Sequence, residues 1–233
     1  MGAGLVPLDR ERKKSGPPRT QPCGPWPVQL RYQTGLTGED YVSRRAWREA
    51  SLPRCPLHPR GGCGFARHGS YPRMAPRGAR VARWYCPQGH RTFSLLPDCL
   101  AARLPGTLAE VEAVVAAVEQ APSLEVAADR LRPEVELPGA LRWTRRRVQR
   151  VHGALAAVRG ILPELFAHCP ATVSGLRARL GVAPVLPAVR SLVPDYLAAL
   201  PAPLGFSPHR LVGGKPPRRR QHQAGPDPPF SPR

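Results

Sequence analysis

The chain has 233 residues, of which 42% are hydrophobic and only 6% aromatic, so we expect an aliphatic core of modest size. Its formal net charge of +19 favours a polyanionic partner. No run of 18 apolar residues occurs and no apolar segment follows the charged N-terminus, so the sequence predicts neither a membrane-spanning nor a secreted protein. We therefore expect a cytoplasmic protein in which the six cysteines are thiols or metal ligands rather than disulfides.

The charge alternates along the chain. Residues 54–104 contain nine arginines and one acid, a balance of +8, whereas residues 105–137 contain seven acids and two arginines, a balance of −5. Residues 138–160 contain six arginines and no acid. Abundant arginine is typical of a GC-rich genome, but codon usage alone would not produce this alternation. The pattern indicates a folded protein with basic faces, and it favours nucleic acid as the partner.

The two ends have the composition of unfolded chain. Residues 1–50 are predicted to be a basic, mostly disordered arm, with one short helix over residues 41–50. In that helix Ser43 is a candidate N-cap and Trp47 the apolar anchor. Residues 207–233 are rich in proline and arginine and are predicted to form a disordered tail.

Short strands are predicted between these ends. The segment "ARVARWYC", residues 79–86, alternates in polarity, which is typical of a strand. The segment "HRTFSLL", residues 90–96, can lie beside it after the turn at Pro87–Gly89.

A helical pattern starts at Thr107. This residue can cap a helix over residues 108–121, with Glu110 as its partner in a capping box. Pro122 ends that helix, and Ser123 can cap a shorter one, "LEVAADRLR".

A third, longer helix is predicted after Pro138, which suits a first helical turn. Its sequence is "GALRWTRRRVQRVHGALAAVRG". Shorter helical segments follow within residues 161–206, which we expect to form a small helical extension.

Two stretches place cysteine and histidine around Pro and Gly: "CPLHPRGGCG" at residues 55–64 and "CPQGH" at residues 86–90. Thiolate and neutral imidazole are both good zinc ligands, so the spacing predicts one tetrahedral zinc site. The predicted ligands are Cys55, Cys63, Cys86 and His90.

The spacing leaves alternatives open, because Cys55-x2-His58 is tighter than the seven-residue gap between the first two cysteines, and either His58 or His68 can replace a ligand. Four protein ligands would make the zinc structural, and a ribbon of this size has too little core to be stable without it. The other cysteines are isolated and are expected to be ordinary thiols: Cys23, Cys99 and Cys169.

The run "CGFARHGSY…RVARWYCPQGHRTFSLLPDCL", followed by "SLEVAADRL", resembles zinc-ribbon proteins associated with bacterial insertion sequences. The resemblance covers about residues 54–152. It implies a zinc ribbon over residues 51–104 and a helix-turn-helix-like DNA-binding region over residues 105–160. In that family two cysteine knuckles hold the metal, and here Cys63 would end the first and Cys86 begin the second, with His90 where a cysteine is usual.

The long helix has a basic face. When its leucines and valines are turned inward at about 100° per residue, five long polar side chains lie on the outer arc. These are Arg142, Arg145, Arg146, Gln149 and Arg150. They can reach phosphates or guanine edges, as a recognition helix does. The alternative is a solvated basic face with no ligand.

The strands are predicted to add a second basic surface that follows a phosphate backbone, including Arg83 and Arg91. Beyond residue 160 the only acids are Glu164, Asp195 and Asp227, too few for a transposase catalytic domain, and no nucleophile motif occurs, so we expect no enzymatic activity. The expectation is a DNA-binding protein with one structural Zn²⁺, which acts as an accessory to a separate transposase, as a transposase remnant or as a regulator. The alternatives are a protein-interaction module with a structural zinc ribbon, and an RNA-binding protein.

Overall fold

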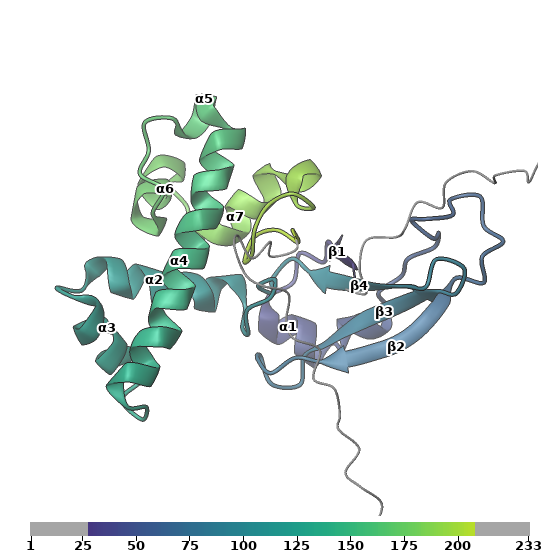
Figure 1. Cartoon of the computed structure of the whole chain (residues 1–233), viewed down its shortest axis with the longest axis horizontal. Helices are drawn as coiled ribbons and strands as arrows, with labels where there is room; N and C mark the ends of the chain where they lie inside the picture. The colour runs from purple at the N-terminus through teal and green to yellow at the C-terminus, as the bar shows by residue number, and fades with distance from the viewer. Residues whose placement is uncertain (1–27, 208–233) are drawn as a thin grey trace, which may run out of the picture.

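The computed structural model of the protein describes residues 28–207, and it consists of a small mixed β-sheet followed by several helices (Figure 1). The predicted order of short strands and then helices is confirmed. The predictions of disorder at the two ends fall on residues 1–27 and 208–233, which lie outside the described residues. Residues 28–50, expected to be largely part of the arm, instead form one strand and two short helices.

The sheet has four strands in the order β1-β4-β3-β2. They are β1 (Val28–Tyr32), β2 (Ala66–Pro72), β3 (Arg80–Cys86) and β4 (Arg91–Pro97). Strands β2, β3 and β4 are antiparallel neighbours, as the tight turn between β3 and β4 predicts, whereas β1 pairs with β4 in parallel. The two strands predicted from sequence are therefore confirmed, and β1 and β2 are additions to them.

The segment predicted as one helix over residues 41–50 is two short helices. Helix α1 (Gly38–Ser43) is capped by Thr37, whose side chain accepts a hydrogen bond from the amide of Asp40. Ser43 is its last residue rather than its cap. The chain then turns through Arg45 at φ 52° and forms the 3₁₀ helix η1 (Ala46–Arg48). Trp47 is buried, as its role of apolar anchor requires.

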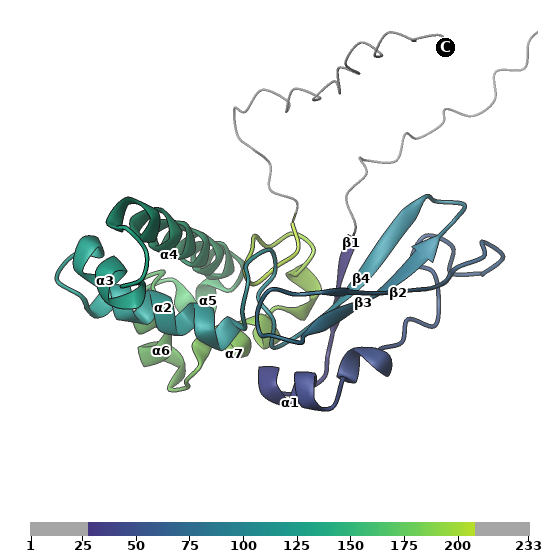
Figure 2. The same cartoon turned by 90° about the horizontal axis from the view of Figure 1, so that it is seen from below.

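These two helices cover one face of the sheet (Figure 2). Because side chains alternate along a strand, Ala82, Trp84 and Cys86 of β3 point to this face. They pack with Tyr41 and Trp47 in a cluster that is richer in aromatic rings than the composition predicts.

The second part of the chain consists of helices, of which the first two begin directly after the predicted caps, Thr107 and Ser123. They are α2 (Leu108–Gln120), α3 (Leu124–Leu131), α4 (Leu137–Ile161), α5 (Pro163–Phe166), α6 (Val173–Leu180), α7 (Val185–Leu192) and the 3₁₀ helix η2 (Pro194–Tyr196). Both hydrogen bonds of the capping box between Thr107 and Glu110 are present, and Ser123 caps α3. None of the helices between residues 28 and 207 combines the length and the apolar character needed to span a bilayer.

The helices share one aliphatic core, to which α2, α4, α6 and α7 contribute leucine and valine side chains. Two carboxylates of α2 also hold α6 and α7 against this core by hydrogen bonds. Glu119 accepts hydrogen bonds of 2.8 Å from the amides of Val173 and Ser174 at the start of α6. Glu112, only 1% exposed, accepts 2.7 Å bonds from Arg177 and from the amide of Leu186 in α7.

The sheet joins this core through Val81 and Leu96, which belong to the same cluster. A buried arginine completes the junction. Arg190 of α7 is 1% exposed and donates to the carbonyls of Asp98 and Leu100, which follow β4. It also donates to the carbonyls of Pro203 and Leu204. The guanidinium group thus ties the end of the sheet to the last segment of the described chain.

Candidate metal centre

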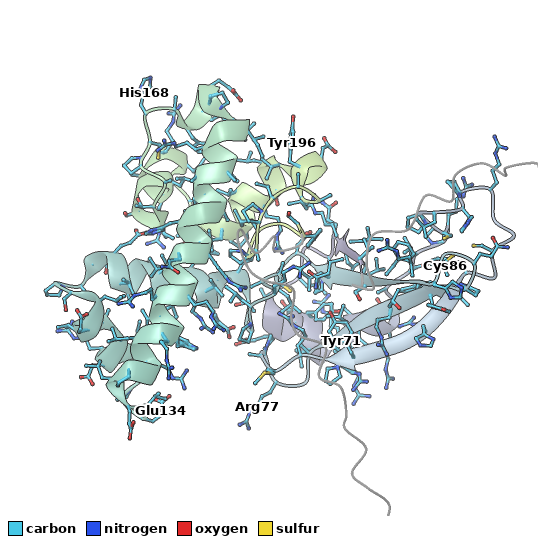
Figure 3. The ribbon with its side chains drawn as sticks, in the orientation of Figure 1. Tyr71, Arg77, Cys86, Glu134, His168 and Tyr196 are labelled. Atoms are coloured by element: carbon cyan, nitrogen blue, oxygen red, sulfur yellow. The ribbon has the colours of Figure 1, made fainter. Side chains whose placement is uncertain are left out.

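Three thiols and one imidazole meet at the end of the sheet that is remote from the helices, where Figure 3 labels Cys86. The sulfur atoms of Cys55, Cys63 and Cys86 and a ring nitrogen of His58 all lie within 4.8 Å of one another. The three cysteines are buried, with exposed fractions of 3%, 3% and 0%. A metal ion could be held by these four residues.

The loop before β2 supplies three of the four groups, and the turn between β3 and β4 supplies the fourth. Gln88 in the turn donates a 3.1 Å hydrogen bond to the carbonyl of Gly62 in the loop, which keeps the two segments together. Gly64 has φ 65°, a left-handed conformation that favours glycine. At Gly89 an added Cβ would lie 2.5 Å from Cδ1 of the exposed Leu57 side chain, which would have to move to admit it.

The distances between the ligand atoms fit a metal ion with tetrahedral coordination. For zinc, with bonds of about 2.3 Å to sulfur and 2.0 Å to nitrogen, the sulfur–nitrogen edge of the tetrahedron is about 3.6 Å. Nδ1 of His58 lies 3.3 Å from Sγ of Cys86 and 3.7 Å from Sγ of Cys55. The spacing between these ligand atoms is therefore already that of a coordination shell.

The surroundings affect the two thiols that face His58 differently. Burial raises the pKa of Cys55, but hydrogen bonds from His58 and from the amides of Leu57 and His58 outweigh burial and lower it to about 7. Burial raises the pKa of Cys86, against a 3.3 Å hydrogen bond from the amide of Gly89. The other two thiols, Cys55 and Cys63, also raise it, because clustered thiols oppose one another's ionisation, and a cation between them would relieve that opposition.

The structure brings together three of the four predicted ligands, Cys55, Cys63 and Cys86. The imidazole in the group is that of His58, the tighter alternative in the spacing. The fourth predicted ligand, His90, lies at φ 46° on the exposed side of the turn, with Nδ1 3.4 Å from the hydroxyl of Tyr85. His68 stacks on Tyr85 instead and is also outside the group.

The predicted basic face of α4 is present on the surface. Arg142, Arg145, Arg146 and Gln149 are exposed, and Arg150 is half-buried. Arg150 donates a 3.3 Å hydrogen bond to the carbonyl of Arg103, so it is partly used within the protein. No hydrogen bond or ion pair within residues 28–207 is found for Arg142, Arg145 or Arg146.

The predicted second basic surface is divided between the faces of the sheet. By register, Arg83 of β3 lies opposite Ser94 on one face, and Arg91 of β4 lies opposite Cys86 on the other. Several neighbouring arginines donate hydrogen bonds to main-chain carbonyls within the protein. Arg67 donates to the carbonyls of Trp47 and Arg48. The main-chain carbonyls that accept from Arg73 are those of Ala101 and Leu104.

The start of α4 packs against α3 through a stack of charged and aromatic groups. The guanidinium groups of Arg132 and Arg147 lie 5.0 and 3.7 Å from the ring centre of Trp143. Burial lowers the pKa of Arg147 to about 10, with help from the nearby charges of Arg132 and Arg146. Trp143 is therefore enclosed by cations, and Arg147, unlike its neighbours, points inward.

No protein-family model matches the chain, and no curated protein or solved structure is similar to it at a significant level. The resemblance to insertion-sequence-associated proteins thus stays a prediction.

Proposed function

We propose that this protein binds DNA, with a structural zinc ion at Cys55, His58, Cys63 and Cys86 and with the outer face of α4 as the DNA contact. One observation carries the proposal: three exposed arginines on one side of α4 have no partner within residues 28–207. Elsewhere in the chain arginines such as Arg67, Arg73 and Arg190 donate to backbone carbonyls. Free guanidinium groups gathered on one helix are available to a ligand.

The spacing of this face supports a polyanion. Arg142, Arg145, Arg146 and Gln149 are separated by three and four residues, so their side chains leave the helix in one direction. Guanidinium groups bind phosphate oxygens and the guanine edge with paired hydrogen bonds. Residues 138–160 contain no acid that would oppose such a ligand.

Zinc is the proposed ion because three thiolates and one imidazole are a set that zinc binds well. When bound, zinc supplies cohesion between the loop at residues 55–63 and the turn after β3. Four protein ligands fill a tetrahedral shell, which supports a structural role rather than a catalytic one.

The proposal includes the partner that the resemblance implies. A zinc ribbon followed by a DNA-binding helix, with no catalytic domain of its own, would act beside a separate transposase. The short α3, the turn at residues 132–136 and the long α4 would form the helix-turn-helix-like unit, with α4 in the major groove.

The test titrates labelled duplex DNA with the wild type and two variants. Binding is measured by fluorescence anisotropy at several salt concentrations. In the first variant Arg142, Arg145 and Arg146 are replaced by alanine. The matched control replaces Arg44, Arg54 and Arg60, three exposed arginines away from α4, and so removes the same charge.

We expect the α4 variant to lose affinity, with the slope of log K against log salt reduced by about 2.7, since each phosphate contact contributes about 0.9. The control should keep the wild-type slope. Equal losses in both variants would show that net charge alone attracts DNA and would refute the assignment to α4. Preference for duplex RNA over DNA would favour the RNA-binding alternative.

A further inference from the structure

The face of the sheet opposite to α1 and η1 carries rings and positive charge. Figure 2 shows α1 and the segment after it on one side of the sheet, with the helical part beyond the end of the strands. On the other side β3 presents Arg83 and Tyr85, which alternate with the buried Ala82, Trp84 and Cys86. We call this the open sheet face, and its exposed or half-buried members are His68, Tyr71, Arg83, Tyr85 and Thr92.

The rings on this face lie beside one another. The ring centres of His68 and Tyr85 are 5.6 Å apart, and Nδ1 of His90 lies 3.4 Å from the hydroxyl of Tyr85. Further along, the guanidinium group of Arg83 lies 5.8 Å from the ring centre of Tyr71. The face thus carries two tyrosine rings, with Arg83 over the ring of Tyr71. Arg83 and Tyr85 are two apart on β3, which places their Cα atoms about 6.8 Å apart.

The charge of the strands complements a polyanion. The four strands contain five arginines and no acidic residue. Asp98, just after β4, is already bound to Arg31 at 2.8 Å. An anionic chain that followed β3 would therefore meet no uncompensated carboxylate among the strand residues.

A row of polar groups on the same face has unused hydrogen-bonding capacity. Gln29, Ser94 and Arg83 are in register across β1, β4 and β3. Oε1 of Gln29 and Nε of Arg83 are buried atoms without a hydrogen-bond partner among residues 28–207. One unsatisfied acceptor and one unsatisfied donor thus lie on this side of the sheet, and both atoms are shielded from solvent.

We infer that the open sheet face binds a single strand of nucleic acid, with unpaired bases stacked on Tyr85 and Tyr71 and the backbone beside Arg83. Stacking on aromatic rings in a positive groove is how proteins hold single strands without regard to sequence. Bases inside a duplex have no free face for such rings, which separates this site from the duplex contact proposed for α4. The inference stands on a different surface, so either proposal can fail alone.

The test uses the full chain loaded with metal and fluorescently labelled dT12 and U12 oligonucleotides. Tyr85→Leu removes the ring but keeps an apolar side chain suited to a strand, and Tyr85→Phe keeps the ring. Metal content is measured on both variants, since Cys86 is adjacent. If Tyr85→Leu loses its metal, the His68→Ala variant replaces it in the comparison.

We expect Tyr85→Leu to bind the single strand about 10-fold more weakly, the effect of one lost stacking contact, and Tyr85→Phe to bind like the wild type. The ratio of dT12 to U12 affinity then identifies the favoured nucleic acid. Absence of binding to both oligonucleotides, or equal affinities of Tyr85→Leu and Tyr85→Phe, would overturn the inference. So would a loss caused only by the alanine substitutions on α4, because the single strand would then lie on that helix. Duplex DNA titrated in parallel reports separately on the proposed function.

Discussion

The sheet half of the protein, residues 28–100, and the helical half, residues 101–207, are held together by different interactions. In the helical half the aliphatic side chains of four helices meet in one continuous core. In the sheet half the buried cluster is smaller, and three of its members are the thiols of the candidate metal centre. The helical half therefore depends on burial of apolar surface, and the sheet half combines a smaller buried cluster with thiols that could hold a metal ion.

Buried and exposed arginines have different roles in the protein. At the junction of the halves Arg190 is enclosed, and burial lowers its pKa to about 10 against the opposing influence of Asp98 and Cys99. It binds four carbonyl groups, of which that of Pro203 also accepts a hydrogen bond from the amide of Ala102. On α4, by contrast, Arg142, Arg145 and Arg146 remain exposed to solvent. Arginine thus stabilises the fold at the junction of the halves, whereas on α4 it is exposed and available to a ligand.

Metal removal should have the largest effect and should act on the sheet half alone. Structural zinc contributes about 10 kcal/mol or more in zinc-finger peptides, so chelation should unfold the end of the sheet near Cys86 and leave the helical half intact. Hydrogen exchange of the full chain measures this: amides of β2, β3 and β4 should lose protection, and those of α2 and α7 should keep it. Loss of protection across both halves together would show that the two are one cooperative unit.

Replacement of Arg190 should affect the junction. In Arg190→Met four carbonyl groups lose the arginine as donor, and that of Pro203 keeps the amide of Ala102, 3.0 Å away. Since each unsatisfied buried group costs about 1–3 kcal/mol, we expect the free energy of unfolding to fall by at least about 3 kcal/mol in urea denaturation. Arg179→Met is the matched control, because this exposed arginine donates to one carbonyl, that of Leu165. A similar loss of stability in both variants would mean that the carbonyl bonds of Arg190 contribute no more than the single bond of Arg179.

Glu119 should give a smaller effect that depends on pH. Burial raises its pKa, but hydrogen bonds from Ser174, His152 and Val173 outweigh burial and lower it. A carboxyl group with a lowered pKa in the folded state stabilises the protein above its unfolded pKa, and this contribution is lost as the pH falls through the folded pKa. Glu119→Gln should therefore be about 1–2 kcal/mol less stable near neutral pH, with the difference shrinking in acid.

The measurement for Glu119 is urea denaturation at a series of pH values. Glu125→Gln, at an exposed position of α3, is the control and should remain close to the wild type. A difference between Glu119→Gln and the wild type that stayed constant into acid would show that the charge of Glu119 does not hold α6.

The smallest effect concerns the start of α2. Thr107→Ala removes the side-chain acceptor for the amide of Glu110, 3.0 Å away, and should lower the free energy of unfolding by about 1 kcal/mol. Thr107→Ser keeps the acceptor and should change stability little. If the serine variant were as unstable as the alanine variant, contacts of the threonine methyl group would be responsible rather than the cap.

The parts of the fold that were predictable from sequence are those with local signals. Thr107 with Glu110, Ser123 and Pro138 mark the starts of three helices, and the turn between β3 and β4 joins adjacent strands. The pairing of β1 with β4 was not predictable, because it joins residues 65 positions apart with no turn to set their register. The burial of Arg190 was not predictable either, since its hydrogen-bond partners lie in distant loops.

The candidate site shows the same limit. The cysteines were found because each lies among proline and glycine residues, but spacing could not choose between His58 and His90. The choice depends on the path of the loop around Gly64 and on the close approach of Gly89 to Leu57, both of which are contacts in space.

Metal stoichiometry shows whether His58 or His90 completes the metal centre, and it is measured on the wild type, His58→Ala and His90→Ala. The two variants are matched, because each removes one imidazole from the same end of the sheet. The account predicts one zinc per chain in the wild type and in His90→Ala, and metal that is lost or much weaker in His58→Ala. A wild type that folds without metal, or loss of the ion only in His90→Ala, would contradict it.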